Sequence, residues 1–246
     1  MSNMREMAIL SLCLISASWA SAQQPATPQT LLAGVLASLG AANRVGSSLS
    51  GNAEFIAGST EDTGSFTASC SVNGSSQLQL QLSSASRTES RTNTNGVAVG
   101  TWTDNEGTQH AFAGHNLYTP ESWFCPHIVL ARIIQNSNLT IHFLGTESRN
   151  GATVAHFTTA AMQPDNTPLS TWITRWTKTD IYLDPETMRP VALGFNIHPD
   201  NNAAIDIPVE IRFSNYTNAG GVWIPFTIEK FVNSALELRL QVQSAS

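Results

Sequence analysis

Six histidines are the residues of this chain best suited to bind a metal or to move protons: His110, His115, His127, His142, His156 and His198. Of these, His142 and His156 are predicted to face each other across a hairpin turn at residues 148–151, because their mean position is 149. The sequence has neither a His-Glu-x-x-His helix nor a Cys-x-x-Cys pair. Structural or surface histidines are therefore the favoured interpretation, with a metal site as the alternative.

Two carboxylates close together, Asp184 and Glu186, flank Pro185 and raise the question of a glycosidase acid pair. Pro185 fixes its own φ, and Asp184 can accept hydrogen bonds from the backbone that follows, so a turn is predicted here instead. A Gly-x-Ser-x-Gly elbow and a phosphate-binding glycine loop are both missing from the sequence. We predict a non-enzymatic protein with no catalytic residues, cofactor or metal.

Residues 1–22 have the three parts of a signal peptide: a weakly basic start at Arg5, an apolar run over 7–19, and the small residues Ala20-Ser21-Ala22. Cleavage after Ala22 would leave one domain over 23–246, secreted, periplasmic or associated with the cell envelope. The two cysteines of that domain, Cys70 and Cys125, are expected to form a disulfide in an oxidising compartment, with two free thiols as the alternative.

The composition argues against two kinds of partner. Charged residues make up 12% of the chain and the net charge is −6, which disfavours non-specific binding to nucleic acid. With two lysines, Lys178 and Lys230, a polybasic membrane patch is not expected. After residue 22 no apolar run approaches the roughly 20 residues of a membrane span.

Two helices are predicted to position any site. The first begins with Thr30 as its cap and runs to about Arg44. The second begins at Thr119-Pro120-Glu121, is interrupted or restarted at Pro126, and ends near residues 136–138. Each has one apolar face, formed by Leu31, Leu32, Val35, Leu36 and Leu39 in the first and by Ile128, Val129, Leu130, Ile133 and Ile134 in the second.

The remaining sequence is predicted to form β-strands. Alternating stretches cover 49–57, 65–72, 77–82, 97–103, 139–144, 152–159, a meander over 179–232, and 235–242, with turns at 73–74, 95–96 and 148–151. The polar stretch 83–95 is interpreted as an edge strand, and 163–169 as a proline-rich loop. The inward face of the meander is predicted to carry Leu183, Val191, Leu193, Phe195, Ile211 and Phe213. We expect an α+β fold in which a large curved antiparallel sheet, a half-barrel, wraps around two or three helices.

Two segments of the meander carry a family resemblance. They are Asp184-Pro185-Glu186-Thr187-Met188-Arg189-Pro190, between two strands, and Gly221-Val222-Trp223-Ile224-Pro225, after the strand Ile211-Arg212-Phe213-Ser214-Asn215-Tyr216. Together with the order of helices and strands, they resemble the periplasmic lipoprotein-sorting family of LolA, LolB and RseB-like half-barrels. The resemblance implies an apolar cavity for acyl chains between the concave sheet and its helices, and a role in envelope lipid or lipoprotein trafficking. Arg44 and Arg87 are the candidates for a basic residue in its lining.

The leading hypothesis is therefore a binding protein for a hydrophobic ligand such as a lipid or acyl chain, with an envelope protein as a further partner. The predicted cavity residues are Leu32, Val35, Leu36, Leu39, Trp123, Ile128, Ile133, Trp172, Trp176, Leu193, Phe195 and Phe213. Core packing is the alternative for the tryptophans. Two other functions stay open: a β-rich envelope module that binds polysaccharide or protein through exposed aromatics, and an enzyme that uses the histidines.

Overall fold

A computed structural model describes residues 26–94, 97–104, 106–163, 165 and 167–246. The predicted signal peptide with its cleavage site, and the predicted turn at 95–96, lie outside these residues. Within the described ranges no helix combines the length and the apolar character needed to cross a bilayer.

The described residues fold into three α-helices, one 3-10 helix and thirteen strands. The helices are α1 (Pro28–Ser38), η1 (Gly114–Tyr118), α2 (Pro126–Gln135) and α3 (Pro168–Thr177). The first six strands are β1 (Gly46–Ala57), β2 (Thr60–Ser71), β3 (Ser76–Leu82), β4 (Ser86–Thr94), β5 (Val97–Thr103) and β6 (Gln109–Ala111). The others are β7 (Leu139–Arg149), β8 (Ala152–Ala161), β9 (Thr179–Leu183), β10 (Pro190–Ile197), β11 (Ile207–Ala219), β12 (Val222–Val232) and β13 (Ala235–Ala245).

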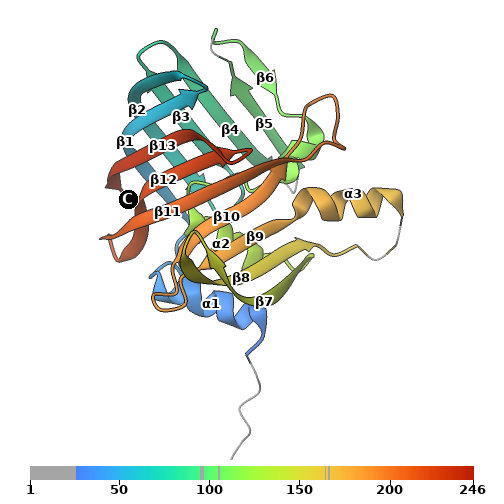
Figure 1. Cartoon of the computed structure of the whole chain (residues 1–246). Coiled ribbons are helices and arrows are strands. Elements are labelled where there is room, and N and C mark those ends of the chain that lie inside the picture. Colours follow the sequence, from blue (N-terminus) through green and yellow to red (C-terminus); the bar gives the residue numbers. More distant parts are fainter. Residues whose placement is uncertain (1–25, 95–96, 105, 164, 166) are drawn as a thin grey trace, which may run out of the picture.

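All thirteen strands belong to one antiparallel sheet in the order β6-β5-β4-β3-β2-β1-β13-β12-β11-β10-β9-β8-β7. The sheet thus has an N-terminal half, β1–β6, and a C-terminal half, β7–β13, which meet where β1 pairs with β13. It curves around the helices and stays open between β6 and β7 (Figure 1). The predicted α+β half-barrel is confirmed.

Helix α1 starts earlier than the sequence pattern indicates. Thr27, not Thr30, is the cap, because its hydroxyl accepts a hydrogen bond from the Thr30 amide at 3.1 Å and Pro28 opens the helix. The helix ends at Ser38, well before Arg44, because Gly40 turns the chain with φ of +72°. A Cβ at Gly40 would lie 2.0 Å from the Gly221 carbonyl oxygen, so the end of α1 packs closely on the β11–β12 turn.

The polar strand β4 is internal and is not the predicted edge. It lies between β3 and β5, and the described edges are β6 and β7. Its alternating charges face the inside of the half-barrel: Arg91 is 6% exposed, and the Arg87 guanidinium lies 3.8 Å from the centre of the Phe55 ring. These charges therefore line the concave side and do not protect a free edge.

The two histidines that were predicted to face each other, His142 and His156, are out of register in the β7–β8 hairpin. Arg149 pairs with Ala152 next to the turn, and in the same register Gly145 pairs with His156. A bulge between Gly145 and Phe143 then shifts the register by one residue, and His142 pairs with Thr158. The prediction of an opposed His142–His156 pair is wrong, because the hairpin turns at Asn150-Gly151 and not around residue 149, which offsets the two histidines.

A second bulge, in β10, displaces Val191 from the predicted inward face. The register shifts between Pro190 and Ala192, and Val191 packs with Val154, Tyr182 and Ala192 in a small cluster apart from the main core. The other five predicted inward residues of the meander are buried in the main core: Leu183, Leu193, Phe195, Ile211 and Phe213.

Candidate functional site

A segment over residues 114–125 spans the concave space between the halves of the sheet; we call it the crossing segment. The Ser76 hydroxyl, at the start of β3, donates a hydrogen bond of 2.6 Å to the Glu121 carbonyl. At its end Cys125 is joined to Cys70 of β2 by a disulfide with a Cα–Cα distance of 6.8 Å. The predicted disulfide is confirmed, and it fastens the segment to the N-terminal half.

The crossing segment is not the predicted start of the second helix. Helix α2 begins at Pro126 with Cys125 as its cap. The Thr119 hydroxyl donates to the Asn116 carbonyl at 2.8 Å, so it closes a turn and caps no helix. The helical signal at Thr119-Pro120 is overridden by these hydrogen bonds and by those of Arg91.

Arg91 of β4 binds the crossing segment through several hydrogen bonds. Its Nη1 atom donates to the carbonyl of Asn116 at 3.1 Å, and to the carbonyl and hydroxyl of Thr119 at 3.2 and 3.0 Å. Its Nη2 atom lies 3.4 Å from the Glu89 carboxylate, and its guanidinium is 4.4 Å from the centre of the Phe112 ring. Burial lowers the pKa of Arg91, and Glu89 opposes that shift. This buried cation is occupied in positioning the backbone.

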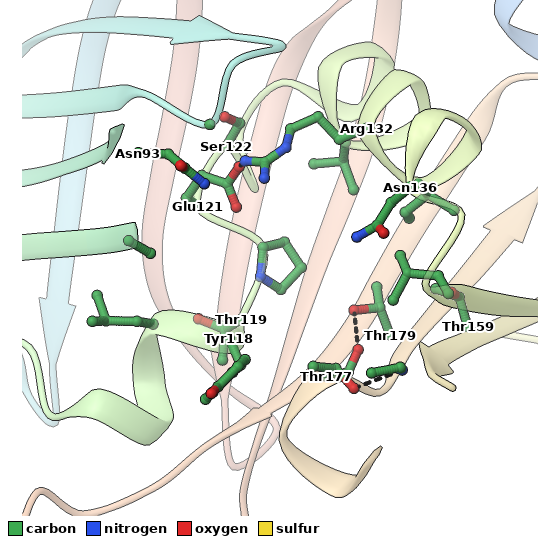
Figure 2. Close-up of a pocket in the computed structure, with 18 of the residues that line it drawn as sticks. Asn93, Tyr118, Thr119, Glu121, Ser122, Arg132, Asn136, Thr159, Thr177 and Thr179 are labelled. Carbon is green, nitrogen blue, oxygen red and sulfur yellow. Dashed lines mark hydrogen bonds and ion pairs between the residues drawn. The ribbon is translucent and has the colours of Figure 1, made fainter. Parts of the chain in front are cut away.

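The crossing segment divides the concave interior into two hollows. The larger has a volume of about 700 Å³ and lies between β4–β5, β7–β9, α2 and α3. Its apolar wall includes Val72, Val129, Ile133, Leu139 and Ile173. Figure 2 shows Arg132 of α2 and Glu121 of the crossing segment at one side of this hollow, with Thr159, Thr177 and Thr179 at the other. The volume falls within the roughly 300–1,000 Å³ of small-molecule sites.

The charged corner of the larger hollow is an ion pair between Arg132 and Glu121. Burial lowers the pKa of Arg132. The guanidinium fits here because the β2–β3 turn has a glycine: a Cβ at Gly74 would lie 2.6 Å from Arg132 Nη1, and the φ of +91° at Gly74 suits glycine. The larger hollow thus combines an apolar wall, one partly buried ion pair, and a set of uncharged polar side chains that includes Asn136, Thr159, Thr177 and Thr179.

The smaller hollow, about 320 Å³, lies on the other side of the crossing segment. Its apolar lining includes Phe55, Leu78, Leu80, Trp102, Phe112, Trp123 and Leu238. Arg87 and Lys230 are its cations, and Lys230 Nζ is 2.7 Å from the Glu237 carboxylate. Of the two basic residues predicted for the lining, Arg87 is here, whereas the Arg44 Nε atom donates to the Gly46 carbonyl at 2.9 Å.

The predicted cavity residues occupy three environments. Ile133 lines the larger hollow and Trp123 the smaller one. Eight residues are buried where α1, α2 and the sheet pack together: Leu32, Val35, Leu36, Leu39, Ile128, Leu193, Phe195 and Phe213. Trp172 and Trp176 are partly buried on α3, with Trp176 stacked on Tyr118 at 5.9 Å between ring centres. A ligand-contacting role for these residues stays a prediction.

Sequence reasoning missed Arg91, Glu121 and Arg132 as residues of the site. A signal was available for Arg91, because Arg87, Glu89 and Arg91 share one face of a strand that follows the strongly alternating β3. Arg132 has no such signal, since its place in the hollow depends on how α2 packs against the β2–β3 turn.

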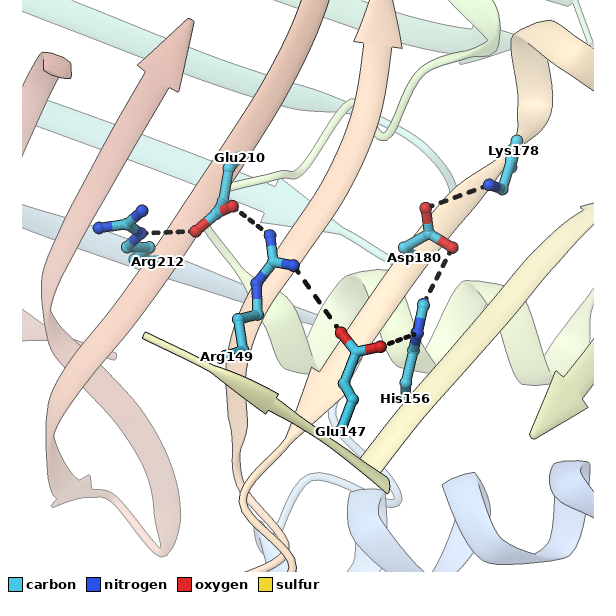
Figure 3. Close-up of polar contacts among 7 residues, drawn as sticks. All are labelled: Glu147, Arg149, His156, Lys178, Asp180, Glu210 and Arg212. Atoms are coloured by element: carbon cyan, nitrogen blue, oxygen red, sulfur yellow. Dashed lines mark hydrogen bonds and ion pairs between the residues drawn. The ribbon is translucent and has the colours of Figure 1, made fainter. Parts of the chain in front are cut away.

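A group of charged side chains lies on the convex face of the C-terminal half. Figure 3 shows the ion pairs that connect its members: Glu147, Arg149, His156, Lys178, Asp180, Glu210 and Arg212. His156 lies between two carboxylates, 3.3 Å from Glu147 and 3.2 Å from Asp180. Since each charge has a partner within the group, we interpret it as a structural network. Among the described residues, no three His, Cys, Asp or Glu side chains are grouped as metal ligands would be.

Comparison with known proteins shows which solved structures have a similar fold. No protein-family model matches the sequence, and no curated protein matches it. Among solved structures, an outer-membrane lipoprotein-sorting protein domain from Vibrio parahaemolyticus matches with a TM-score of 0.54 at 12% identity, over 89% of this chain and 91% of that one. A DUF1329 family protein from Desulfovibrio piger matches with a TM-score of 0.53 at 10% identity, over 89% and 90%. A LolA superfamily protein from Nitrosomonas europaea matches with a TM-score of 0.50 at 11% identity, over 87% and 91%.

The chain has the LolA-type half-barrel fold. These matches span nearly the whole of both chains, so the likeness concerns the complete sheet with its helices. The resemblance expected from the two meander segments is confirmed at the level of the fold. Within this LolA-type fold, the larger and smaller hollows lie on the concave side, where the sequence resemblance predicted a cavity.

Proposed function

We propose that this protein is an extracytoplasmic, non-enzymatic binding protein that holds one hydrophobic ligand, a lipid or acyl chain, in the larger hollow. The observation that carries the proposal is the composition of that hollow: about 700 Å³, with an apolar wall, one ion pair at its corner, and uncharged polar side chains such as Asn136 and Thr159 on the remaining sides. Such sites bury an apolar ligand against hydrophobic side chains and orient it with few polar groups.

The arrangement of the lining supports an orientation for the ligand. Val129, Ile133 and Leu139 line the hollow and offer apolar side chains against which an acyl chain would pack. The polar end of the ligand would lie near Arg132 and Glu121, which supply a donor and an acceptor within the hollow. We expect an amphiphile and not a pure hydrocarbon, because an apolar ligand alone would leave this pair desolvated and without added contacts.

Two further observations agree with a role outside the cytoplasm. The Cys70–Cys125 disulfide is typical of oxidising compartments. The similar structures include a lipoprotein-sorting domain and a LolA superfamily protein, and in this chain the same fold offers a concave site of suitable size. Trafficking of envelope lipids or lipoproteins is the corresponding biological role that we propose.

The test is direct detection of a ligand. Protein purified without detergent is extracted with organic solvent, and native mass spectrometry compares its mass before and after extraction. We expect one bound amphiphile per chain and saturable uptake of a fluorescent acyl-chain probe by the extracted protein. A ligand-free protein that also takes up no probe would overturn the proposal.

A further inference from the structure

Helix α3 has an apolar face that the rest of the protein covers only in part. Leu169, Trp172, Ile173 and Trp176 recur at the spacing that places them on one face of a helix. Ile173 lines the larger hollow and Trp176 packs against Tyr118, whereas Leu169 at the start of the helix is 61% exposed. Figure 1 shows α3 projecting at the side of the molecule, away from α1.

More exposed apolar residues lie around α3. Met162 follows β8, whose last residue Ala161 accepts a hydrogen bond from Thr174 of α3 at 3.2 Å. Ile205 lies in the loop that receives hydrogen bonds from α3, since Arg175 donates to the Ala204 carbonyl at 2.8 Å. We call the exposed and partly exposed apolar side chains on and beside α3 the α3 tip; they are Tyr118, Met162, Leu169, Trp172, Trp176 and Ile205.

The aromatic rings of the α3 tip are ordered against one another. Trp172 stacks on Trp176 with 5.7 Å between ring centres, and Trp176 stacks on Tyr118. The Trp176 indole N–H donates to the Ala203 carbonyl at 3.4 Å. Rings with an apolar body and a polar group are the side chains enriched at membrane–water interfaces.

The charges beside the α3 tip are paired. Arg175 Nη2 lies 2.9 Å from Asp206, and Lys178 Nζ lies 3.4 Å from Asp180. With a net charge of −6 on the whole chain, an anionic surface would not attract this protein electrostatically. Contact made by the tip must therefore come from its apolar and aromatic side chains.

We propose that the α3 tip docks the protein on the surface of a lipid bilayer, with Leu169, Trp172 and Ile205 entering the interface. Docking there brings the larger hollow next to the lipid, because Tyr118 and the α3 residues Ile173 and Thr177 are part of its lining. This inference rests on the proposed function, since the membrane is then the source or the acceptor of the bound amphiphile. The driving force is burial of apolar surface and does not depend on lipid charge.

The experiment compares two leucines of nearly equal exposure in vesicle flotation. Leu169 is 61% exposed in the α3 tip, and Leu144 is 58% exposed on β7. Full-length mature protein is mixed with vesicles of phosphatidylcholine alone, or of phosphatidylethanolamine with phosphatidylglycerol. We expect Leu169→Glu to lower the water-to-vesicle partition coefficient about tenfold or more, and Leu144→Glu to leave it within about twofold of wild type. Wild-type protein should bind similarly to both kinds of vesicle. Raising the NaCl concentration from about 0.05 to about 0.5 M should change the partition coefficient of the wild-type protein little.

The inference is overturned if wild-type protein stays unbound, if both variants lose binding equally, or if binding needs phosphatidylglycerol and disappears in salt. Binding of the α3 tip to a soluble polysaccharide or to a protein, and not to vesicles, would also overturn the inference. Circular dichroism checks that both variants fold. Uptake of the acyl-chain probe without vesicles separates the two proposals: probe uptake without flotation removes the docking inference alone, and flotation without probe uptake removes the proposed ligand site alone.

Discussion

Asn116 and His198 form a closed pair of hydrogen bonds between a side-chain amide and a backbone. The Asn116 Nδ2 atom donates to the His198 carbonyl at 2.8 Å, and the His198 amide donates to Asn116 Oδ1 at 2.9 Å. The residues are 82 positions apart and both are buried. Their contact joins the crossing segment to the loop after β10, so the wall between the hollows depends on it.

Replacing Asn116 by Asp should destabilise the protein by about 3 kcal/mol. The substitution removes the donor to the His198 carbonyl and places a buried carboxylate oxygen against that carbonyl oxygen. Urea unfolding measures the change, and Asn201→Asp, at an exposed position, is the matched control. A loss below about 1 kcal/mol for Asn116→Asp would contradict the importance given to this contact.

Removal of the disulfide should lower the free energy of unfolding by about 2–5 kcal/mol. Cys70 and Cys125 close a loop with a sequence separation of 55, and the cross-link reduces the entropy of the unfolded chain. The double variant Cys70→Ala/Cys125→Ala should melt at a lower temperature than wild type and be insensitive to a thiol reductant. Equal melting temperatures for oxidised wild type and the double variant would contradict this expectation.

Stability should fall as the pH drops below about 6.5, in part because of His127. Burial, with the Arg44 charge as a second cause, lowers the pKa of His127 from 6.5 to about 4. The unfolded chain therefore binds a proton more readily than the folded protein between these pH values. Its contribution is fully present above pH 6.5 and is lost as pH falls toward 4, by about 3 kcal/mol in total.

The matched variant for this pH effect is His127→Gln, which keeps a polar group near the Ser47 hydroxyl that lies 2.9 Å from His127 Nε2. Its free energy of unfolding should depend less on pH between 4 and 6.5 than that of wild type. Chemical unfolding at a series of pH values measures both slopes. Parallel curves for the two proteins would show that His127 does not titrate as described.

Filling the larger hollow should abolish ligand binding without unfolding the protein. Leu139→Trp places an indole in the hollow that Leu139 lines, whereas Leu144→Trp makes the same change at an exposed position on the same strand. We expect the acyl-chain probe to bind Leu139→Trp at least about tenfold more weakly than wild type, and Leu144→Trp to bind normally. Normal binding by a folded Leu139→Trp variant would place the ligand elsewhere.

Local patterns predicted much of the sheet. In β3 the leucines at 78, 80 and 82 are buried while the intervening glutamines are exposed, as strict alternation indicates. Asp184 accepts hydrogen bonds from the amides of Glu186 and Thr187, so the turn chemistry at Pro185 holds in the structure. These features depend on neighbouring residues alone, and for that reason the sequence shows them.

Features that depend on distant parts of the chain were mispredicted or missed. The position of β4 follows from the pairing of β5 and β6 beyond it, and the β7–β8 hairpin turns later than predicted, which leaves His142 out of register with His156. Pro168 and the Thr167 cap begin a helix inside the stretch predicted as a proline-rich loop. The Arg132–Glu121 pair arises from packing between α2 and the crossing segment. No local pattern encodes these relationships, so the candidate site was less predictable than the sheet around it.

The strand order determines when, during synthesis of the chain, the two halves of the sheet can pair. The N-terminal meander runs from β1 at the middle of the sheet to β6 at one edge, and the C-terminal meander runs from β7 at the other edge to β13 at the middle. The second neighbour of β1 is therefore β13, the last described strand in the sequence. Glu54 of β1 and Arg239 of β13 form an ion pair across 185 residues. A chain emerging from its amino end would hold β1 as a temporary free edge until β13 follows. The two meanders therefore join into one sheet only after β13 has been made. A chain interrupted before Ala235 would retain two separate curved sheets in place of one.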